Sequence, residues 1–582
     1  MAIRYGRGDV KQTTTGFRGP LMVQSLTSAK SKFLSLKVCI ALQKLELAAR
    51  KTPRKITMEP IATQDLPHNQ FVMLCSTSFK RYYEDIDVGY IYNSITQNEQ
   101  FLDQDATALL KLIERSPKAI RTVLSELDTA KRSDSNDTET PSILALLKAL
   151  ESDGYILIGD SEIELNAKDP RFHYGPRSKR PTPTDSVKGY LPASTRGGFT
   201  ELFKEHPRIL FFQLEVTSKC NERCAHCYLP SNWFEFNDLD TELGLKVLDE
   251  LRDEGSLIVC FSGGEAFLHK EFDKLLYRAR ENDLIIKINT NATHISDYYL
   301  QVLKEVQPEK LQISLYSMTA EEHDLITQVP GSHKRAMDGI TRLMEANICI
   351  SINCPVMKGN KHCYRDVVRW GEQNGVEVRT DFMLFGCTDF NQANLDSRLS
   401  IEDIEELIQD SLKYDSTYRA KIENDESAVN PLDLIQEPVC GAGVSSLSMD
   451  AKGNTYFCPI FRPVELGNAK EDRLRDVWRQ SRPLLELRKV TWGDFPGCMK
   501  CEAFNYCNMC FARNANESDG GHLDVNEMCC QISLLNKRLV EEHREKVGTH
   551  TRSRRSSKKV SFRVVANSSR QPSVDTHTGG SS

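Results

Sequence analysis

Short apolar runs alternate with amphipathic segments between residues 208 and 385. The apolar runs have the length and composition of strands that are buried on both faces. They predict strands at residues 209–216, 257–261, 284–288, 311–316, 348–352 and 376–379. The intervening segments carry apolar residues at helical spacing and predict helices at residues 243–253, 267–280, 298–306, 333–346 and 366–374. This alternation indicates an α/β fold with a parallel sheet, in which loops at the carboxyl ends of the strands carry the chemistry.

A second, smaller pattern precedes this region. Strands are predicted at residues 71–74, 89–93 and 155–158, and helices at residues 105–114, 117–127 and 142–150. Ser116 is the predicted N-cap of the middle helix, with Pro117 at its first position. The pattern therefore predicts a separate α/β domain before the large sheet.

The remaining segments have the composition of linkers and tails. Residues 1–57 are basic and rich in Ser and Thr, which is typical of an organelle transit peptide but also of an unstructured leader, or of a chain that truly starts at Met58. The stretch at 161–205 is rich in Pro, Gly, Ser and charge and predicts a linker. The expected organisation is a leader at 1–67, a small domain at 68–160, a linker at 161–205, a barrel at 206–390, a helical connector at 391–435, a cysteine-rich domain at 436–545 and a disordered basic tail at 546–582.

Bulk composition narrows the class of protein. The net charge is −6, which gives no general attraction to nucleic acid, and no apolar run reaches membrane-spanning length. No positively charged segment followed by an apolar run opens the chain, so a secretory signal is not expected. Most of the 18 cysteines lie in clusters with short metal-ligand spacings. We therefore expect a cytoplasmic protein with metal thiolates and with neither nucleic acid nor a membrane as partner.

Three cysteines directly follow the first predicted strand of the large sheet. Cys220, Cys224 and Cys227 have the spacing C-x3-C-x2-C. A structural zinc site uses four protein ligands, and a [4Fe–4S] cluster that only carries electrons uses four thiolates. Three thiolates on a four-iron cluster leave one iron open to a reactive ligand. The alternative is a zinc site that takes its fourth ligand from elsewhere in the chain.

The C-x3-C-x2-C run resembles the signature of the radical S-adenosylmethionine (SAM) superfamily. The resemblance implies a partial (βα)6 barrel and a [4Fe–4S] cluster whose open iron is chelated by the amino and carboxylate groups of SAM. Gly263-Gly264-Glu265 follows the second strand and resembles the Gly-Gly-Glu motif, in which Glu265 would accept a hydrogen bond from the SAM amino group. Further SAM-binding residues implied by the resemblance are His226, Asn291, Ser314 and Asn353.

A second cysteine field lies after residue 430. Cys440 and Cys458 enclose a pattern with Gly453, and the run C-x2-C-x5-C-x2-C and the Cys529-Cys530 pair follow. Taken alone, the C-x2-C pairs favour a zinc ribbon. After a radical SAM barrel they resemble the SPASM extension with two auxiliary [4Fe–4S] clusters, although the last spacing is x2 where the family has x3. The outer cluster would then be held by Cys498, Cys501 and Cys507 with Cys529 or Cys530, and the inner cluster by Cys440, Cys458 and Cys510. The inner cluster either has an open iron or takes the remaining cysteine of the pair.

The small amino-terminal domain resembles a winged helix and, more narrowly, the PqqD-like recognition element of peptide-modifying enzymes. A generic α/β cap is the alternative. The combined resemblances predict an enzyme that cleaves SAM reductively to a 5′-deoxyadenosyl radical and modifies a peptide or protein by a crosslink, a thioether or a related oxidation. The substrate leader would add as a strand to the small domain, and a ferredoxin or flavodoxin would supply electrons. The alternatives are a sulfatase-maturase-like or small-molecule radical SAM oxidoreductase, and a zinc-stabilised interaction scaffold without activity.

Overall fold

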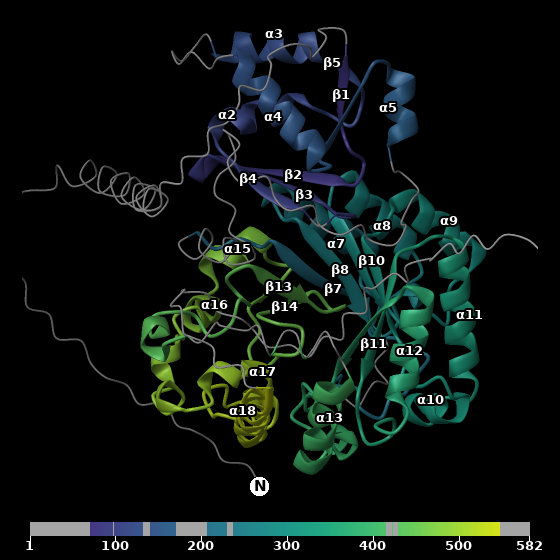
Figure 1. The fold of residues 1–582 in the computed structure, drawn as a ribbon, viewed down its shortest axis with the longest axis vertical. Helices are drawn as coiled ribbons and strands as arrows, with labels where there is room; N and C mark the ends of the chain where they lie inside the picture. Colours follow the sequence, from purple (N-terminus) through teal and green to yellow (C-terminus); the bar gives the residue numbers. More distant parts are fainter. Residues whose placement is uncertain are drawn as a thin grey trace, which may run out of the picture. The chain divides into compact units, whose positions relative to one another are not determined.

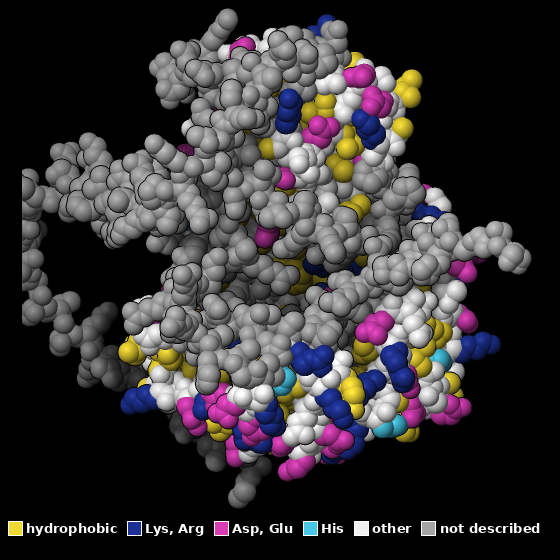
Figure 2. All heavy atoms as spheres, in the orientation of Figure 1, with side chains coloured by type: hydrophobic (Ala, Val, Ile, Leu, Met, Phe, Trp, Pro, Cys, Tyr) yellow, Lys and Arg dark blue, Asp and Glu magenta, His cyan; other side chains and the backbone are white. Residues whose placement is uncertain are grey.

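The computed structural model describes residues 70–96, 98–131, 140–169, 206–229, 237–414, 419, 422 and 429–547 (Figure 1). The predicted leader, most of the predicted linker and the tail from residue 548 lie outside the described residues. Figure 2 shows Lys and Arg side chains interspersed with Asp and Glu over the described surface in the lower part of the view, a pattern typical of a solvated surface. No helix within the described ranges is both long enough and apolar enough to span a membrane.

The six predicted strands form a parallel sheet in sequence order, which confirms the predicted α/β pattern. They are β7 Phe211–Thr217, β8 Ile258–Gly263, β9 Ile285–Thr290, β10 Lys310–Ser314, β11 Ile350–Pro355 and β12 Glu377–Asp381. Side chains such as Phe212 and Phe261 are completely buried in the core that these strands share with their helices. The parallel order brings the carboxyl ends of all six strands to one edge, where polar residues gather.

Helices connect these strands along the chain. They are α7 Thr241–Asp253, α8 Phe272–Glu281, α9 Asp297–Val306, α10 Ala320–Thr327, α11 Ser332–Glu345 and α12 Tyr364–Asn374. Asp240 and Ser296 accept hydrogen bonds from backbone amides of the first turns of α7 and α9. In Figure 1, α9, α11 and α12 lie along the same side of the strands. The helix predicted at 267–280 is wrong in its first part, because Glu265 caps a short 3-10 turn, Ala266–Leu268, before α8 begins.

The carboxy-terminal region extends the same sheet. β13 Ser446–Met449 pairs parallel with β7, and it turns back into β14 Asn454–Tyr456, which pairs with β15 Gly467–Asn468. Cys440 precedes β13 and Cys458 follows β14, so antiparallel pairing brings both cysteines to the same end of the hairpin. The sheet therefore has nine strands and joins the barrel to the cysteine-rich region.

Helices complete the carboxy-terminal region. They are α13 Ile401–Tyr414, α15 Leu474–Gln480, α16 Arg482–Leu487, α17 Phe511–Asn516 and α18 Glu527–Val547. Helix α13 packs against α18. The last two predicted cysteine ligands, Cys529 and Cys530, lie in the first turn of α18.

The amino-terminal domain has two small sheets and its own core. β1 Phe71–Leu74 pairs antiparallel with β5 Lys118–Ala119 and β6 Ile156–Gly159. The strands β2 Ser78–Tyr83, β3 Val88–Asn93 and β4 Glu99–Leu102 form an antiparallel meander. The helices are α2 Gln104–Leu112, α3 Ile120–Lys131 and α4 Thr140–Ser152. Apolar residues of α2, α3 and α4 pack with β1 and β6 into a common cluster.

Two predictions in this domain are wrong at their boundaries. The helix expected from Pro117 with Ser116 as its cap starts at Ile120, because Lys118 and Ala119 pair with β1. The linker expected from residue 161 starts later, because Glu162–Lys168 forms helix α5. Ser161 caps this helix and Leu165 is fully buried, so the domain extends to residue 169.

The amino-terminal domain is bonded to the barrel. Arg81 Nε donates to the Ser256 carbonyl at 2.8 Å, and the Tyr92 hydroxyl donates to Glu309 at 2.7 Å. Aromatic side chains of β2, β3 and β4 also pack with Leu257 and Ile285 at the amino ends of β8 and β9. Deleting the domain would expose this apolar surface, so a deletion variant is not a clean test of its role.

Candidate functional site

The first cysteine cluster lies on the loop that follows β7, where the fold places chemistry. Cys220, Cys224 and Cys227 are all partly exposed. The Gly264 amide donates to the Thr217 carbonyl at 2.8 Å, and the Glu265 amide donates to the Lys219 carbonyl at 2.7 Å. A Cβ atom on Gly264 would lie 2.1 Å from the Lys219 carbonyl oxygen. Glycine is therefore required at position 264, because the backbone that leads into the cysteine loop lies too close to the end of β8 for a side chain.

The loop after β12 holds the other side of the cysteine loop. The Asn394 side-chain amide donates to the carbonyls of Cys227 at 3.2 Å and Phe385 at 2.8 Å. The Thr388 amide donates to the Tyr228 carbonyl at 2.9 Å. These bonds fix the backbone around the third cysteine and connect it to the end of the barrel.

Glu265 is a buried carboxylate of the site that accepts three hydrogen bonds from the protein. It is fully buried and accepts from the Thr290 hydroxyl at 2.7 Å, the Phe267 amide at 3.2 Å and the Asn291 amide at 2.7 Å. A carboxylate has about four acceptor positions. Three of them are occupied by the protein itself, so Glu265 chiefly fixes the ends of β8 and β9 against each other.

The other predicted SAM-binding residues gather at neighbouring strand ends. Asn291 donates to the side chain of Asn221 in the cysteine loop at 2.9 Å, and Ser314 of β10 is in register with Asn353 of β11. The His226 ring meets the Tyr316 ring edge-on, with centroids 4.9 Å apart. Burial lowers the pKa of His226 to about 4, so its imidazole is neutral. The structure thus brings Glu265 and Asn291 to the cysteine loop, which itself carries His226, and places Ser314 beside Asn353.

Glu222 is a site residue that the sequence pattern did not reveal. It lies between Cys220 and Cys224 and is 2% exposed, and its Oε1 has no hydrogen-bond partner in the part of the chain that the structure describes. Burial, together with the charge of Glu265, raises the pKa of Glu222 to about 7. In the sequence it stands in a polar stretch beside Asn221 and Arg223, so nothing marked it as buried.

The thiols of the first cluster are spaced too widely for one metal ion. Burial raises the pKa of Cys220 to about 12 and that of Cys227 to about 11, so metal binding must displace their protons. Sulfur ligands on one zinc ion, at about 2.3 Å from the metal, lie within about 4 Å of one another. We looked within the described ranges for three or more His, Cys, Asp or Glu ligand atoms that all lie within 4.8 Å of one another. Glu322, His362 and Cys363 form such a group, and it contains none of the clustered cysteines. Three thiols on one loop are the donor set that a [4Fe–4S] cluster with one open iron requires.

The second cysteine field follows short turns. Cys498 starts the 3-10 turn Cys498–Lys500, and Cys507 follows the turn Phe504–Tyr506. Burial raises the pKa of Cys498 to about 11, with smaller contributions from Cys507, Cys530 and Cys501. Burial also raises the pKa of Cys458 to about 12, with contributions from Cys440 and Cys510. Cys529 and Cys530 both interact with Cys507, and Cys529 interacts with Cys510 as well.

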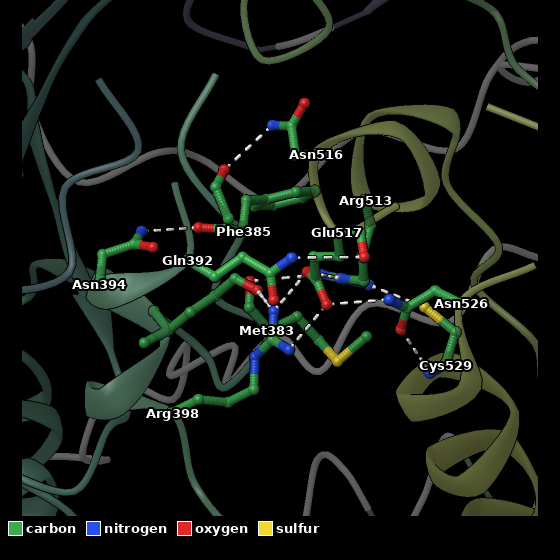
Figure 3. Close-up of polar contacts among 12 residues, drawn as sticks. Met383, Phe385, Gln392, Asn394, Arg398, Arg513, Asn516, Glu517, Asn526 and Cys529 are labelled. Atoms are coloured by element: carbon green, nitrogen blue, oxygen red, sulfur yellow. Dashed lines mark hydrogen bonds and ion pairs between the residues drawn. The ribbon is translucent and has the colours of Figure 1, made fainter. Parts of the chain in front are cut away.

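A buried polar network joins the end of the barrel to the second cysteine field (Figure 3). Arg398 donates to both carboxylate oxygens of Glu517, at 2.9 and 2.5 Å. Arg513 donates to Cys529 Sγ at 3.2 Å, and its guanidinium lies over the Phe385 ring with 4.6 Å to the centroid. The loop after β12 therefore bonds to Cys227 through Asn394, and through Phe385 it also contacts Arg513, which donates to Cys529.

Comparison with known proteins identifies both cysteine regions. Residues 214–371 match the profile of the Radical SAM superfamily, and residues 440–510 match that of SPASM, an iron–sulfur cluster-binding domain. An AdoMet-dependent heme synthase of Nitratidesulfovibrio vulgaris is 26% identical over 54% of this chain and 90% of that protein. AlbA, the antilisterial bacteriocin subtilosin biosynthesis protein of Bacillus subtilis, is 26% identical over 54% of this chain and 70% of that protein.

A solved structure shares the fold. Streptococcus suis SuiB, crystallised with its precursor peptide SuiA, has a TM-score of 0.53 and 15% identity over 79% of this chain and 99% of SuiB. The family matches confirm the predicted enzyme class and cofactors, and they set aside the zinc scaffold. The chain carries a radical SAM domain followed by a SPASM domain, and it is an enzyme that binds SAM, a [4Fe–4S] cluster and auxiliary iron–sulfur clusters.

Proposed function

We propose that this enzyme modifies a peptide or protein substrate by a crosslink, a thioether or a related oxidation. The observation that carries the proposal is the amino-terminal domain of residues 70–169, which has its own core and is bonded to the barrel. SuiB was crystallised with a precursor peptide. Its fold likeness covers 79% of this chain, which is more residues than the barrel and the cysteine-rich region have together. The sequence likeness to AlbA supports the same class of substrate.

The amino-terminal domain is the proposed binding site for a substrate leader, as in PqqD-like modules. The meander of β2, β3 and β4 is a sheet to which an extended peptide can add as a strand. When bound, SAM and its cluster supply a 5′-deoxyadenosyl radical for hydrogen abstraction. The chain's own contribution is to hold the cysteine loop between the end of β8 and the loop around Asn394, and to seat SAM at the strand ends.

The test uses the full-length enzyme, purified and reconstituted without oxygen. It is incubated with SAM, a reductant and peptides encoded by short reading frames next to its gene, and the peptides are analysed by mass spectrometry. We expect one peptide to lose two hydrogens, since a crosslink or thioether forms by removing two hydrogen atoms, and to accelerate 5′-deoxyadenosine formation. Peptides that neither change mass nor affect SAM cleavage would contradict the proposal.

A tetrapyrrole substrate is the second candidate. The likeness to heme synthases favours it, because those proteins match this chain over 90% and 96% of their own length. A porphyrin precursor of heme therefore serves as a parallel substrate in the same assay. A porphyrin product formed in place of a modified peptide would replace the first proposal by the second.

A further inference from the structure

Glu222 has a buried carboxylate oxygen that is left unpaired among the described residues. Its Oε1 is shielded from solvent and has no hydrogen-bond partner within those ranges. Leaving a buried acceptor unpaired is costly, and leaving a buried carboxylate unpaired costs more. A residue in this state, two positions after one cysteine and two before the next, points to a ligand that donates hydrogen bonds.

The groups around Glu222 do little to stabilise its negative charge. Glu265 is close enough to repel it, while the attractive charge that acts on Glu222 comes from Arg335, an exposed residue of α11. The Cys224 thiol donates to Glu222 Oε2 with 3.6 Å between the sulfur and the oxygen. A cysteine that ligates iron is a thiolate and has no proton to donate. Loading the cluster therefore removes this partner and leaves Glu222 still less satisfied.

We propose that Glu222 accepts a hydrogen bond from the amino group of SAM. SAM has hydrogen-bond donors on its amino group, its ribose and its adenine. The amino group is the one expected to chelate the open iron, and Glu222 lies between two of the cysteines expected to hold that cluster. Glu265, which the sequence pattern suggested for this role, already accepts three hydrogen bonds from the protein. Glu222 lies beside it with a free acceptor and is thus a further cofactor-binding residue, specific for the amino-acid end of SAM.

The test compares Glu222→Gln with the unchanged enzyme, both full-length and with clusters reconstituted. Glutamine keeps the shape and removes the charge. We expect the Kd for SAM, measured by anaerobic calorimetry, to rise about 10- to 100-fold, as for loss of one charge-assisted hydrogen bond. The Kd for S-adenosylhomocysteine, which keeps the amino group, should rise equally. The Kd for 5′-methylthioadenosine, which lacks it, should not change, and Glu345→Gln, at an exposed position of α11, is the matched control.

Three results would overturn this proposal. One is an unchanged Kd for SAM in Glu222→Gln with a full complement of iron. Another is a loss of iron with an unchanged Kd per remaining cluster, which would mean that Glu222 supports Cys224 and not SAM. A fall in affinity for 5′-methylthioadenosine as large as that for SAM would also place the effect elsewhere in the pocket.

A second inference concerns Arg513, and it rests on Cys529 being a ligand of an auxiliary cluster. Arg513 is 3% exposed and donates to Cys529 Sγ (Figure 3). With Arg398 and Glu517, the network holds two positive charges and one negative charge, so one positive charge is left to face the sulfur. Hydrogen bonds to the ligand sulfurs and nearby charge are the levers that set cluster potentials. The geometry points to Arg513 as a positioning residue that raises the reduction potential of this cluster, because a positive charge stabilises the more negative, reduced state.

Potentiometric titration followed by electron paramagnetic resonance tests this on the full-length enzyme. Arg513→Gln should lower the midpoint potential of one auxiliary cluster and leave that of the SAM-binding cluster unchanged, and Arg513→Lys, which keeps the charge, should shift it less. Arg398→Gln also removes one positive charge from the network but leaves the hydrogen bond to the sulfur, so it should lower the midpoint less than Arg513→Gln does. Unchanged midpoints in Arg513→Gln, or an equal shift in Arg398→Gln, would overturn the inference. Unchanged iron in Cys529→Ala would instead show that Cys529 is not a ligand.

Discussion

Replacing Cys224 by alanine should abolish the formation of 5′-deoxyadenosine from SAM. Cys224 is one of three thiols on the loop after β7, and a four-iron cluster held by only two thiolates is not retained in a reactive form. The enzyme should lose about four of its about 12 iron atoms, since three [4Fe–4S] clusters are expected. Chromatography of the reaction products and iron counting on the reconstituted protein measure both effects, and Cys220→Ala and Cys227→Ala should behave alike.

Cys387→Ala is the matched control for this experiment. Cys387 is buried, and its Sγ lies 3.5 Å from the Cys227 carbonyl oxygen, yet its spacing in the sequence does not mark it as a ligand. The control variant should keep its iron and its SAM cleavage. SAM cleavage at the unchanged rate in Cys224→Ala would refute the assignment of the three-cysteine loop.

Local patterns predicted the barrel because the apolar spacing of each strand and helix can be recognised within a few residues. The run at 209–216 is apolar throughout, and Asp240 and Ser296 stand where helix caps are expected. Strand β13 was missed because it is short and gains its stability from pairing with β7, more than 200 residues earlier. Helix α5 was missed because its composition resembles a linker, while its burial depends on contacts with β1 and β6.

Cysteine spacing singles out candidate ligands, but it does not predict the residues that surround them. The runs at 220–227 and 498–510 carry their information in sequence distance alone. The hydrogen bond from Arg513 to Cys529 and the proximity of Glu222 to Glu265 depend on how separate elements pack, which no local pattern encodes. The same is true of Gly264, whose small size serves the cysteine loop. Positions of this kind become visible only in three dimensions.

Replacing Cys498 by alanine should block product formation while SAM cleavage continues. The residues expected to seat SAM come from the cysteine loop and the ends of β8 to β11, and none comes from residues 498–530. Alanine at position 498 leaves those residues in place, so 5′-deoxyadenosine should still form without substrate. Modified product, detected by mass spectrometry once the substrate is known, should fall by more than about 100-fold, above the usual loss for a residue that only supports a ligand.

The Cys529-Cys530 pair sharpens this last prediction. Cys498 interacts with Cys530, while Cys529 is held by Arg513 and interacts with Cys510 as well as Cys507. Whichever of Cys529→Ala and Cys530→Ala loses the same cluster signal in electron paramagnetic resonance as Cys498→Ala identifies the fourth ligand of the outer cluster. If Cys498→Ala made product at the normal rate with iron missing, the outer cluster would be dispensable. The auxiliary domain would then act through its structure alone, by joining β13 to β7 and Glu517 to Arg398 at the end of the barrel.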